Sequence, residues 1–135
     1  FDRILLDPPC SAMGQRPQLT NSLQLKEIST YPSYQWCFVA DAVKMLKYSG
    51  TLVYSTCTLP KQENEMMVAR ILRSFPEMRL VPAEPLLGHP GILVEGLSND
   101  DVLMVQRFLP NSDLDSGVDV DTIGFFIAKF MKDKV

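Results

Sequence analysis

The sequence predicts an α/β fold whose sheet is mostly parallel. Two short apolar runs, at residues 4–6 and 52–54, have the character of buried strands, and each is followed by a cysteine. The segment between them shows the apolar spacing of an amphipathic helix, and a second helical segment follows the second run. Strand, helix, strand and helix with short links indicate parallel strands joined by right-handed crossovers. A chain of 135 residues with 46% hydrophobic content has the size and composition of one packed domain.

The amino-terminal half is predicted to form one strand-helix-strand unit. In chain order we expect a strand over 2–6, a polar loop over 7–22, helices over about 23–30 and 33–47, and a strand over 51–56. Pro32 is expected to break the helical segment in two, because proline lacks a backbone N–H and clashes with the preceding turn. Val39, Val43 and Leu46 recur at helical spacing and predict the buried face of the second piece.

The carboxyl-terminal half is predicted to be less regular. We expect a helix over about 60–73, strands over 78–81, 104–109 and 124–130, a brief helical turn over 99–103, and loops over 82–97 and 110–121. Val68, Ile71 and Leu72 form the predicted buried stripe of the helix. Glu63 and Glu65 are expected near its amino end, where the helix dipole favours negative charge.

Composition and charge indicate a globular protein of a reducing compartment. No apolar run approaches the ~20 residues of a membrane-spanning helix, so we expect no membrane association. The three cysteines are odd in number and lack CxxC spacing, which argues against a disulfide scaffold or a zinc site, and we expect no metal. The predicted location is the cytoplasm, with the nucleus as the alternative. The net charge of −3 is unfavourable for nucleic-acid binding, so most contacts to RNA phosphates would have to come from elsewhere.

Cys10 and Cys57 occupy equivalent positions, after the ends of the two apolar strands. Ligands of open α/β sheets bind at the carboxyl ends of the strands, so these side chains are expected to face a crevice. Neighbouring parallel strands lie roughly 4.8 Å apart, which would let both thiols face one small substrate. The helix expected soon after Cys57 would favour its thiolate. A single cysteine beside a strand is more often an inert core residue, but a matched pair favours chemistry.

The beginning of the chain suggests that it is part of a larger domain. Phe1 lies directly inside a predicted strand, and no glycine-rich phosphate or nucleoside loop occurs anywhere in the sequence. We therefore interpret the chain as the carboxyl-terminal half of a longer domain.

Four motifs carry a resemblance to a known family. In chain order they are Asp7-Pro-Pro-Cys10-Ser-Ala, then Leu52-Val-Tyr-Ser-Thr-Cys57-Thr with Glu63-Asn-Glu65 after it, then Gln106-Arg-Phe-Leu-Pro110, then Gly124-Phe-Phe-Ile-Ala-Lys129. Together they resemble the Sun-domain family of RNA cytosine carbon-5 methyltransferases over nearly the whole chain. Residues 13–17 and 123–130 are most similar to the member-six branch, which acts on the acceptor stem of transfer RNA and carries an added PUA domain.

The resemblance implies a fold and a domain boundary. The fold would be the class I (Rossmann-like) sheet of S-adenosylmethionine-dependent methyltransferases, mostly parallel, with helices on both faces and an antiparallel last strand. Residues 1–135 would be a partial catalytic domain that lacks the amino-terminal, cofactor-binding half. The isolated chain is accordingly expected not to methylate RNA.

The resemblance also implies roles for three residues. Cys57 would be the nucleophile that adds to carbon 6 of cytosine and so activates carbon 5 toward the methyl group of S-adenosylmethionine. Cys10 would assist the release step, as a base or as helper to one. Asp7 would lie where the cofactor and the target cytosine meet, and transfer RNA is the expected substrate. Apart from the resemblance, the place of Arg16 in the loop after Cys10 makes it a candidate to contact an RNA phosphate or the neighbours of the target base, whereas the alternative is an exposed, solvated arginine. The target base would have to be unstacked to reach the site.

Other interpretations of the same residues are weaker. The Asp7-Pro8-Pro9 start also resembles methyltransferases that act on exocyclic nitrogens, but Cys10 stands where their motif has an aromatic residue. Many members of the Sun-domain family have Ala and Gly where this chain has Pro8 and Ala12, so the turn is expected to differ in shape.

Among the remaining candidates, Cys37 is predicted to be structural. His89 is predicted to be a loop residue, which disfavours a Cys-His hydrolase. The alternative from another class of protein is a catalytically inactive fragment that acts as an RNA-binding or assembly module.

Overall fold

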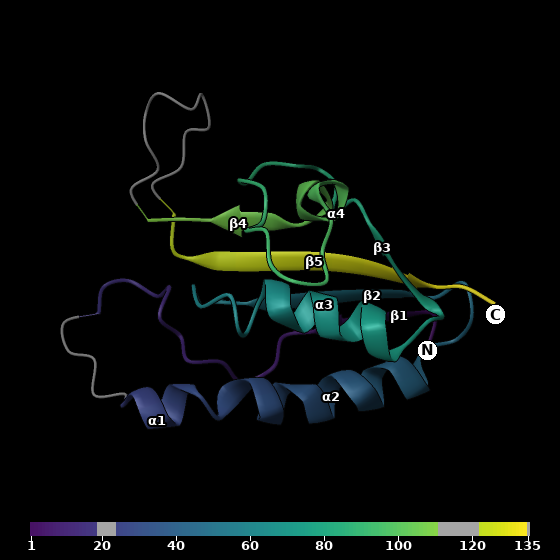
Figure 1. The fold of residues 1–135 in the computed structure, drawn as a ribbon, viewed down its shortest axis with the longest axis horizontal. Helices are drawn as coiled ribbons and strands as arrows, with labels where there is room; N and C mark the ends of the chain where they lie inside the picture. The colour runs from purple at the N-terminus through teal and green to yellow at the C-terminus, as the bar shows by residue number, and fades with distance from the viewer. Residues whose placement is uncertain (19–23, 111–121, 135) are drawn as a thin grey trace.

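The computed structural model describes residues 1–18, 24–110 and 122–134, and in them five strands form a single sheet (Figure 1). The strands are β1 (Arg3–Leu6), β2 (Thr51–Thr56), β3 (Met78–Val81), β4 (Gln106–Phe108) and β5 (Phe125–Lys132). Their order is β1, β2, β5, β3, and β4 also pairs with β5. β1 and β2 are parallel, whereas β5 is antiparallel to β2, β3 and β4. The mostly parallel sheet with a reversed last strand is therefore confirmed.

The two long helices cover the same face of this sheet. The helices are α1 (Leu25–Ile28), α2 (Tyr31–Met45), α3 (Glu65–Ser74) and α4 (Asn99–Met104). Val43 of α2 and Ile71 of α3 belong to one buried cluster with Leu52 of β2, and in Figure 1 α2 runs beneath the strands while α3 is drawn across β1 and β2. The expectation of helices on both faces is wrong for the described residues. Two successive right-handed crossovers that step in the same direction across a sheet place their helices on one face.

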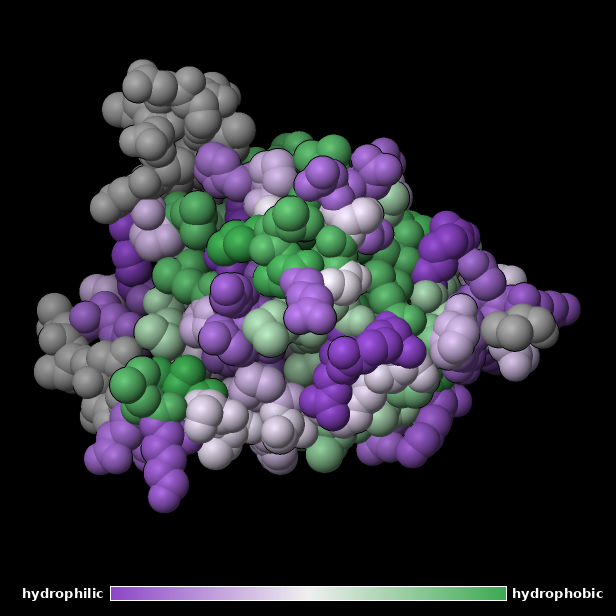
Figure 2. Space-filling model, viewed as in Figure 1, coloured by the Kyte–Doolittle hydropathy of each residue, from purple (hydrophilic) through white to green (hydrophobic). Residues whose placement is uncertain are grey.

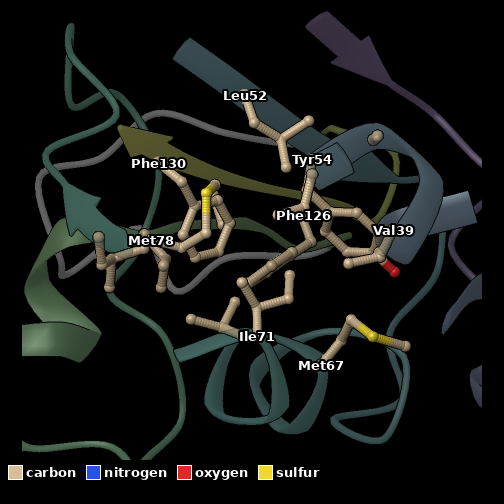
Figure 3. Close-up of a cluster of buried hydrophobic side chains, with 14 of the residues drawn as sticks. Val39, Leu52, Tyr54, Met67, Ile71, Met78, Phe126 and Phe130 are labelled. Atoms are coloured by element: carbon tan, nitrogen blue, oxygen red, sulfur yellow. The ribbon is translucent and has the colours of Figure 1, made fainter. Parts of the chain in front are cut away.

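The core lies between this helix pair and the sheet, as Figure 3 shows. Leu52 and Tyr54 of β2 and Phe126 and Phe130 of β5 alternate with residues on the opposite face, so their side chains share the helix-covered side. The Tyr54 hydroxyl donates a 2.7 Å hydrogen bond to the carbonyl oxygen of Glu63, and burial raises the pKa of Tyr54. The core thus reaches the segment that follows Cys57.

Two predicted helix boundaries are wrong. Pro32 lies in the first turn of α2 rather than at a break, because the first turn of a helix tolerates a residue without an N–H. α3 begins at Glu65, and the preceding residues form turns. Glu63 therefore precedes the helix, and Cys57 lies eight residues before it. The expected effect of a helix dipole on the Cys57 thiolate has no structural basis here.

The surface mixes apolar and charged side chains. Figure 2 shows hydrophobic residues gathered where the segment between β3 and α4 crosses the molecule, and the exposed apolar side chains of that segment include Leu86, Leu87, Ile92 and Leu93. Across the described residues, no helix is long and apolar enough to span a bilayer. The loop predicted over 110–121 lies, except for Pro110, outside the described residues.

Replacing Phe130 with alanine in the 135-residue chain should lower the free energy of unfolding by about 3–5 kcal/mol, because a fully buried aromatic side chain leaves a cavity. Leu103→Ala is the control: Leu103 is 55% exposed, and its loss should change stability by no more than about 0.5 kcal/mol. Urea unfolding followed by the fluorescence of Trp36, the only tryptophan, measures both. Equal losses for the two variants would contradict the core as described.

Candidate active site

The structure brings the thiols of Cys10 and Cys57 into direct contact. Their sulfur atoms lie 3.3 Å apart, although the residues are 47 positions apart in the chain. The parallel pairing of β1 with β2 places Leu6 opposite Tyr54, so both strands deliver their following residues to the same edge of the sheet. Both cysteines are free and partly exposed. The prediction that two thiols share one site at the strand ends is confirmed, whereas their chemical roles remain predictions.

The environment of Cys10 keeps its thiol protonated. The pKa of Cys10 is raised from 9.0 to about 12: burial is the largest cause and the neighbouring Cys57 side chain adds to it, while the backbone N–H groups of Ala12 and Cys57 act in the opposite direction. At neutral pH the Cys10 thiol is therefore protonated. Two sulfurs in contact do not both ionise easily, because like charges repel. The pair is thus suited to hold one thiol as a proton carrier beside a second that reacts.

The loop after Cys10 is fixed to the ends of β2 and β5 through Gly14. The Gly14 N–H donates a 3.0 Å hydrogen bond to the Cys57 carbonyl oxygen, and the Gly124 N–H donates a 2.7 Å bond to the Gly14 carbonyl oxygen. A Cβ atom at Gly14 would collide with the backbone of Gly124, so only glycine fits. Gln15, next in the loop, donates from Nε2 to the Cys57 sulfur at 3.4 Å. Gln15 was not among the predicted site residues, since no local pattern marks a contact across 42 positions.

The departures from the family motif are accommodated within this turn. Ala12 adopts a positive φ of 54°, the left-handed region where glycine is the usual residue. Pro8 is buried, and the Pro9 carbonyl oxygen accepts a hydrogen bond from Gln35. With Pro8 and Ala12 in this turn, the Cys10 sulfur still lies in contact with the Cys57 sulfur.

The other predicted site residues lie at the same edge. Asp7 follows β1 directly, is exposed, and accepts a 3.3 Å hydrogen bond from the Ser55 hydroxyl. Arg16 is exposed and donates from Nη2 to the Thr122 carbonyl oxygen at 2.9 Å, which ties the loop to the segment before β5. Contacts of these residues with cofactor or RNA remain predictions.

Two further residues named from the sequence lie outside this cluster. Cys37 is on the exposed side of α2, so it is a surface residue and does not support the core. His89 lies in the segment between β3 and α4 and pairs through its backbone with Arg107. Within the described ranges, no group of three or more metal-ligating side chains is present.

The sheet has a reversed strand between β2 and β3, and two thiols are in contact at adjacent strand ends. Together these features define a class I methyltransferase with a cysteine pair. The match to a family model makes the assignment specific. The model described as 16S rRNA methyltransferase RsmB/F matches residues 1–131. The chain belongs to this family.

Individual relatives agree with the family. The chain is 44% identical to the human tRNA (cytosine(72)-C(5))-methyltransferase NSUN6, over 99% of this chain and 32% of the relative. It is 43% identical to the tRNA (cytosine(72)-C(5))-methyltransferase of Pyrococcus horikoshii, over 98% of this chain and 30% of the relative. The crystal structure of NSun6 from Pyrococcus horikoshii with SFG superposes with a TM-score of 0.78 at 41% identity, covering 97% of this chain and 30% of that one. The chain spans about a third of the length of these relatives.

The raised pKa of Cys10 predicts a distinctive alkylation profile. In the variant Cys37→Ser/Cys57→Ser, Cys10 is the only thiol of the chain. Its rate of reaction with iodoacetamide should keep rising by about tenfold per pH unit above pH 9, because only the thiolate reacts and burial, the largest cause of the shift, remains. The same variant unfolded in urea is the control and should level off near pH 9. A plateau near pH 9 in the folded protein would contradict the environment described for Cys10.

Proposed function

We propose that the protein containing this chain methylates carbon 5 of cytosine in RNA, with S-adenosylmethionine as methyl donor and transfer RNA as substrate. The observation that carries this proposal is the 3.3 Å contact between the Cys10 and Cys57 sulfurs at the ends of adjacent parallel strands. Relatives that are 44% and 43% identical to this chain are named as transfer RNA cytosine carbon-5 methyltransferases. Because the chain spans about a third of their length, the activity belongs to the complete protein.

Cys57 is the proposed nucleophile. Its thiolate adds to carbon 6 of cytosine, which places negative charge on carbon 5 and makes that atom reactive toward an electrophilic methyl group. The protonated state of Cys10 favours this division of roles, because a thiol that keeps its proton is a poor nucleophile and the attack is therefore assigned to Cys57. Gln15 donates to the Cys57 sulfur and is placed to stabilise its charge before the attack.

Cys10 is proposed to act in the release step. After methyl transfer, carbon 5 must lose its proton and the bond between carbon 6 and Cys57 must break to restore the aromatic ring. Once Cys57 is bound to the base it no longer carries charge, so one cause of the raised pKa of Cys10 is removed. To act as the base, Cys10 must first release its own proton to solvent. Otherwise it acts as the group that positions the base, and its contact with the Cys57 sulfur places it beside the reacting bond in either role.

Asp7 and Arg16 are proposed to bind the other reactants. S-adenosylmethionine supplies the methyl group, and a structural neighbour of this chain was solved with SFG. The exposed Asp7 carboxylate, beside the thiols, can accept hydrogen bonds from an amino group of the cofactor or of cytosine. Arg16 is proposed to contact an RNA phosphate. A transfer RNA enzyme of this kind would act in the cytoplasm, with the nucleus as the alternative.

Two substitutions in the full-length protein separate the proposed roles. Cys57→Ala should abolish methyl transfer to a transfer RNA transcript, because no other group activates carbon 5. Cys10→Ala should still form the covalent bond but fail to release it, and should accumulate a protein–RNA adduct that survives denaturing electrophoresis. The double variant Cys10→Ala/Cys57→Ala is the control and should form no adduct.

The outcome also tests the alternative of a non-catalytic module. If the full-length wild-type protein binds transfer RNA but incorporates no methyl group and forms no adduct, the chain is an RNA-binding or assembly module. An active Cys57→Ala variant together with an adduct-free Cys10→Ala variant would overturn the assignment of roles.

A further inference from the structure

Each cysteine of the pair is followed by a hydroxyl residue, and these two hydroxyls are joined to one buried carboxylate. The oxygens of Ser11 and Thr58 lie 2.7 Å apart, and the Ser11 hydroxyl lies 2.6 Å from Oε1 of Glu63. We propose that Glu63 is a positioning residue that fixes the separation of the two reactive thiols through Ser11 and Thr58. This inference rests on the proposed function and adds the group that sets the geometry of the thiol pair.

The contacts of Glu63 hold Cys10 from both sides. Glu63 Oε2 accepts hydrogen bonds from the Ser11 backbone N–H at 3.0 Å and from Gln35 Nε2 at 2.8 Å. The same Gln35 nitrogen donates to the Pro9 carbonyl oxygen at 3.1 Å. Ser11 is therefore bonded to Glu63 Oε2 directly, and Pro9 is connected to the same oxygen through Gln35. Because Glu63 and Gln35 are fully buried, water does not compete for these bonds.

The carboxylate also sets the direction of the hydroxyl chain that leads to Cys57. A carboxylate can only accept hydrogen bonds, so the Ser11 hydroxyl is the donor in its hydrogen bond to Glu63. The Ser11 oxygen then accepts from the Thr58 hydroxyl, and the Thr58 oxygen accepts from the Met13 N–H at 3.2 Å. The donor and the acceptor of each hydrogen bond are thus assigned, and only one relative arrangement of the two loops satisfies all of them. The turn that carries Cys10 and the turn that carries Cys57 are thereby held as one unit.

A comparison with Glu65 shows that the hydrogen-bond partners of Glu63 do not follow from its burial alone. Both side chains are fully buried, but Glu65 pairs with Arg107, whose Nε lies 2.5 Å from Oε1. The hydrogen-bond donors to the Glu63 side chain within the described residues are neutral: the Ser11 N–H, the Ser11 hydroxyl and the Gln35 amide. A buried carboxylate without a cation is costly to desolvate, and this cost is offset only by well-formed hydrogen bonds. Those bonds converge on the cysteine loops, which identifies the loops as what Glu63 organises.

The experiment measures the thiol separation directly and without substrate. In the full-length protein, dibromobimane bridges Cys10 to Cys57 only when the sulfurs are close, and mass spectrometry of the bridged peptide identifies the pair. The test variants are Glu63→Gln, which keeps the shape but removes the charge that fixes the hydroxyl direction, and Ser11→Ala, which removes the central hydroxyl. Glu65→Gln is the matched control, because it alters an equally buried carboxylate whose own hydrogen bonds go to Arg107 and the Ile92 N–H instead of to Ser11 and Gln35.

We expect Glu63→Gln and Ser11→Ala to lower the rate of bridging several-fold and kcat about tenfold, with the KM for transfer RNA little changed, because misplaced reacting groups lower the chemical step. Their effects should not add in the double variant, since both act through one chain of bonds. Glu65→Gln should lower the melting temperature and leave the bridging rate unchanged below it. Ser11→Ala is the smaller change and keeps the test decisive if Glu63→Gln fails to fold.

An unchanged bridging rate in the folded Glu63→Gln or Ser11→Ala protein would overturn the inference, whatever its effect on kcat. Equal loss of bridging in Glu65→Gln would also overturn it, because the effect would then reflect general loosening. If the wild-type protein transfers no methyl group while bridging still depends on Glu63, the proposed function fails and the positioning role stands.

Discussion

The parallel pairing of β1 with β2 is the interaction on which the site depends. With Leu6 opposite Tyr54, the residues that leave each strand emerge at one edge, and a slip by one residue would send the side chains to opposite faces of the sheet. Ile4 and Leu6 of β1 pack against the buried cluster that contains Leu52 and Tyr54 of β2, and a slip of β1 by one residue would turn Ile4 and Leu6 away from that cluster. The 3.3 Å separation of the two sulfurs is therefore maintained by the hydrophobic core as well as by local contacts.

Strand ends were predictable from the sequence, whereas the contacts across them were not. Short apolar runs mark β1 and β2 clearly, and parallel topology then predicts that Cys10 and Cys57 meet. Ser11, Thr58 and Glu63 form bonds over 47 and 52 positions, and no local periodicity reveals such partners. For the same reason the sequence predicts a start of α3 near residue 60, whereas the helix begins at Glu65.

The segment before α3 shows how long-range bonds override helix signals. Pro60 and the acidic residues after it are typical of a first helical turn, but Glu63 is instead drawn into the cysteine loops. Its backbone carbonyl oxygen accepts from Tyr54 and its side chain accepts from Ser11. These bonds satisfy its polar groups outside the helix, so α3 begins only at Glu65. The boundary is thus set by the site, and the cost of a shorter helix is offset by a fixed active-site loop.

The charge of the chain suggests how binding and chemistry are divided in the complete protein. Sequence-independent affinity for RNA comes mainly from lysine and arginine contacts to phosphates, and a net charge of −3 gives this chain little of that attraction. The groups at its strand ends are instead suited to act on one base: two thiols, the Asp7 carboxylate and the Gln15 amide. The two-thirds of the relatives' length that lies outside the match is therefore where phosphate contacts are to be sought. Under the proposed function, this acidic segment would contribute the reaction centre through its cysteine pair, and the rest of the protein would supply most of the phosphate contacts.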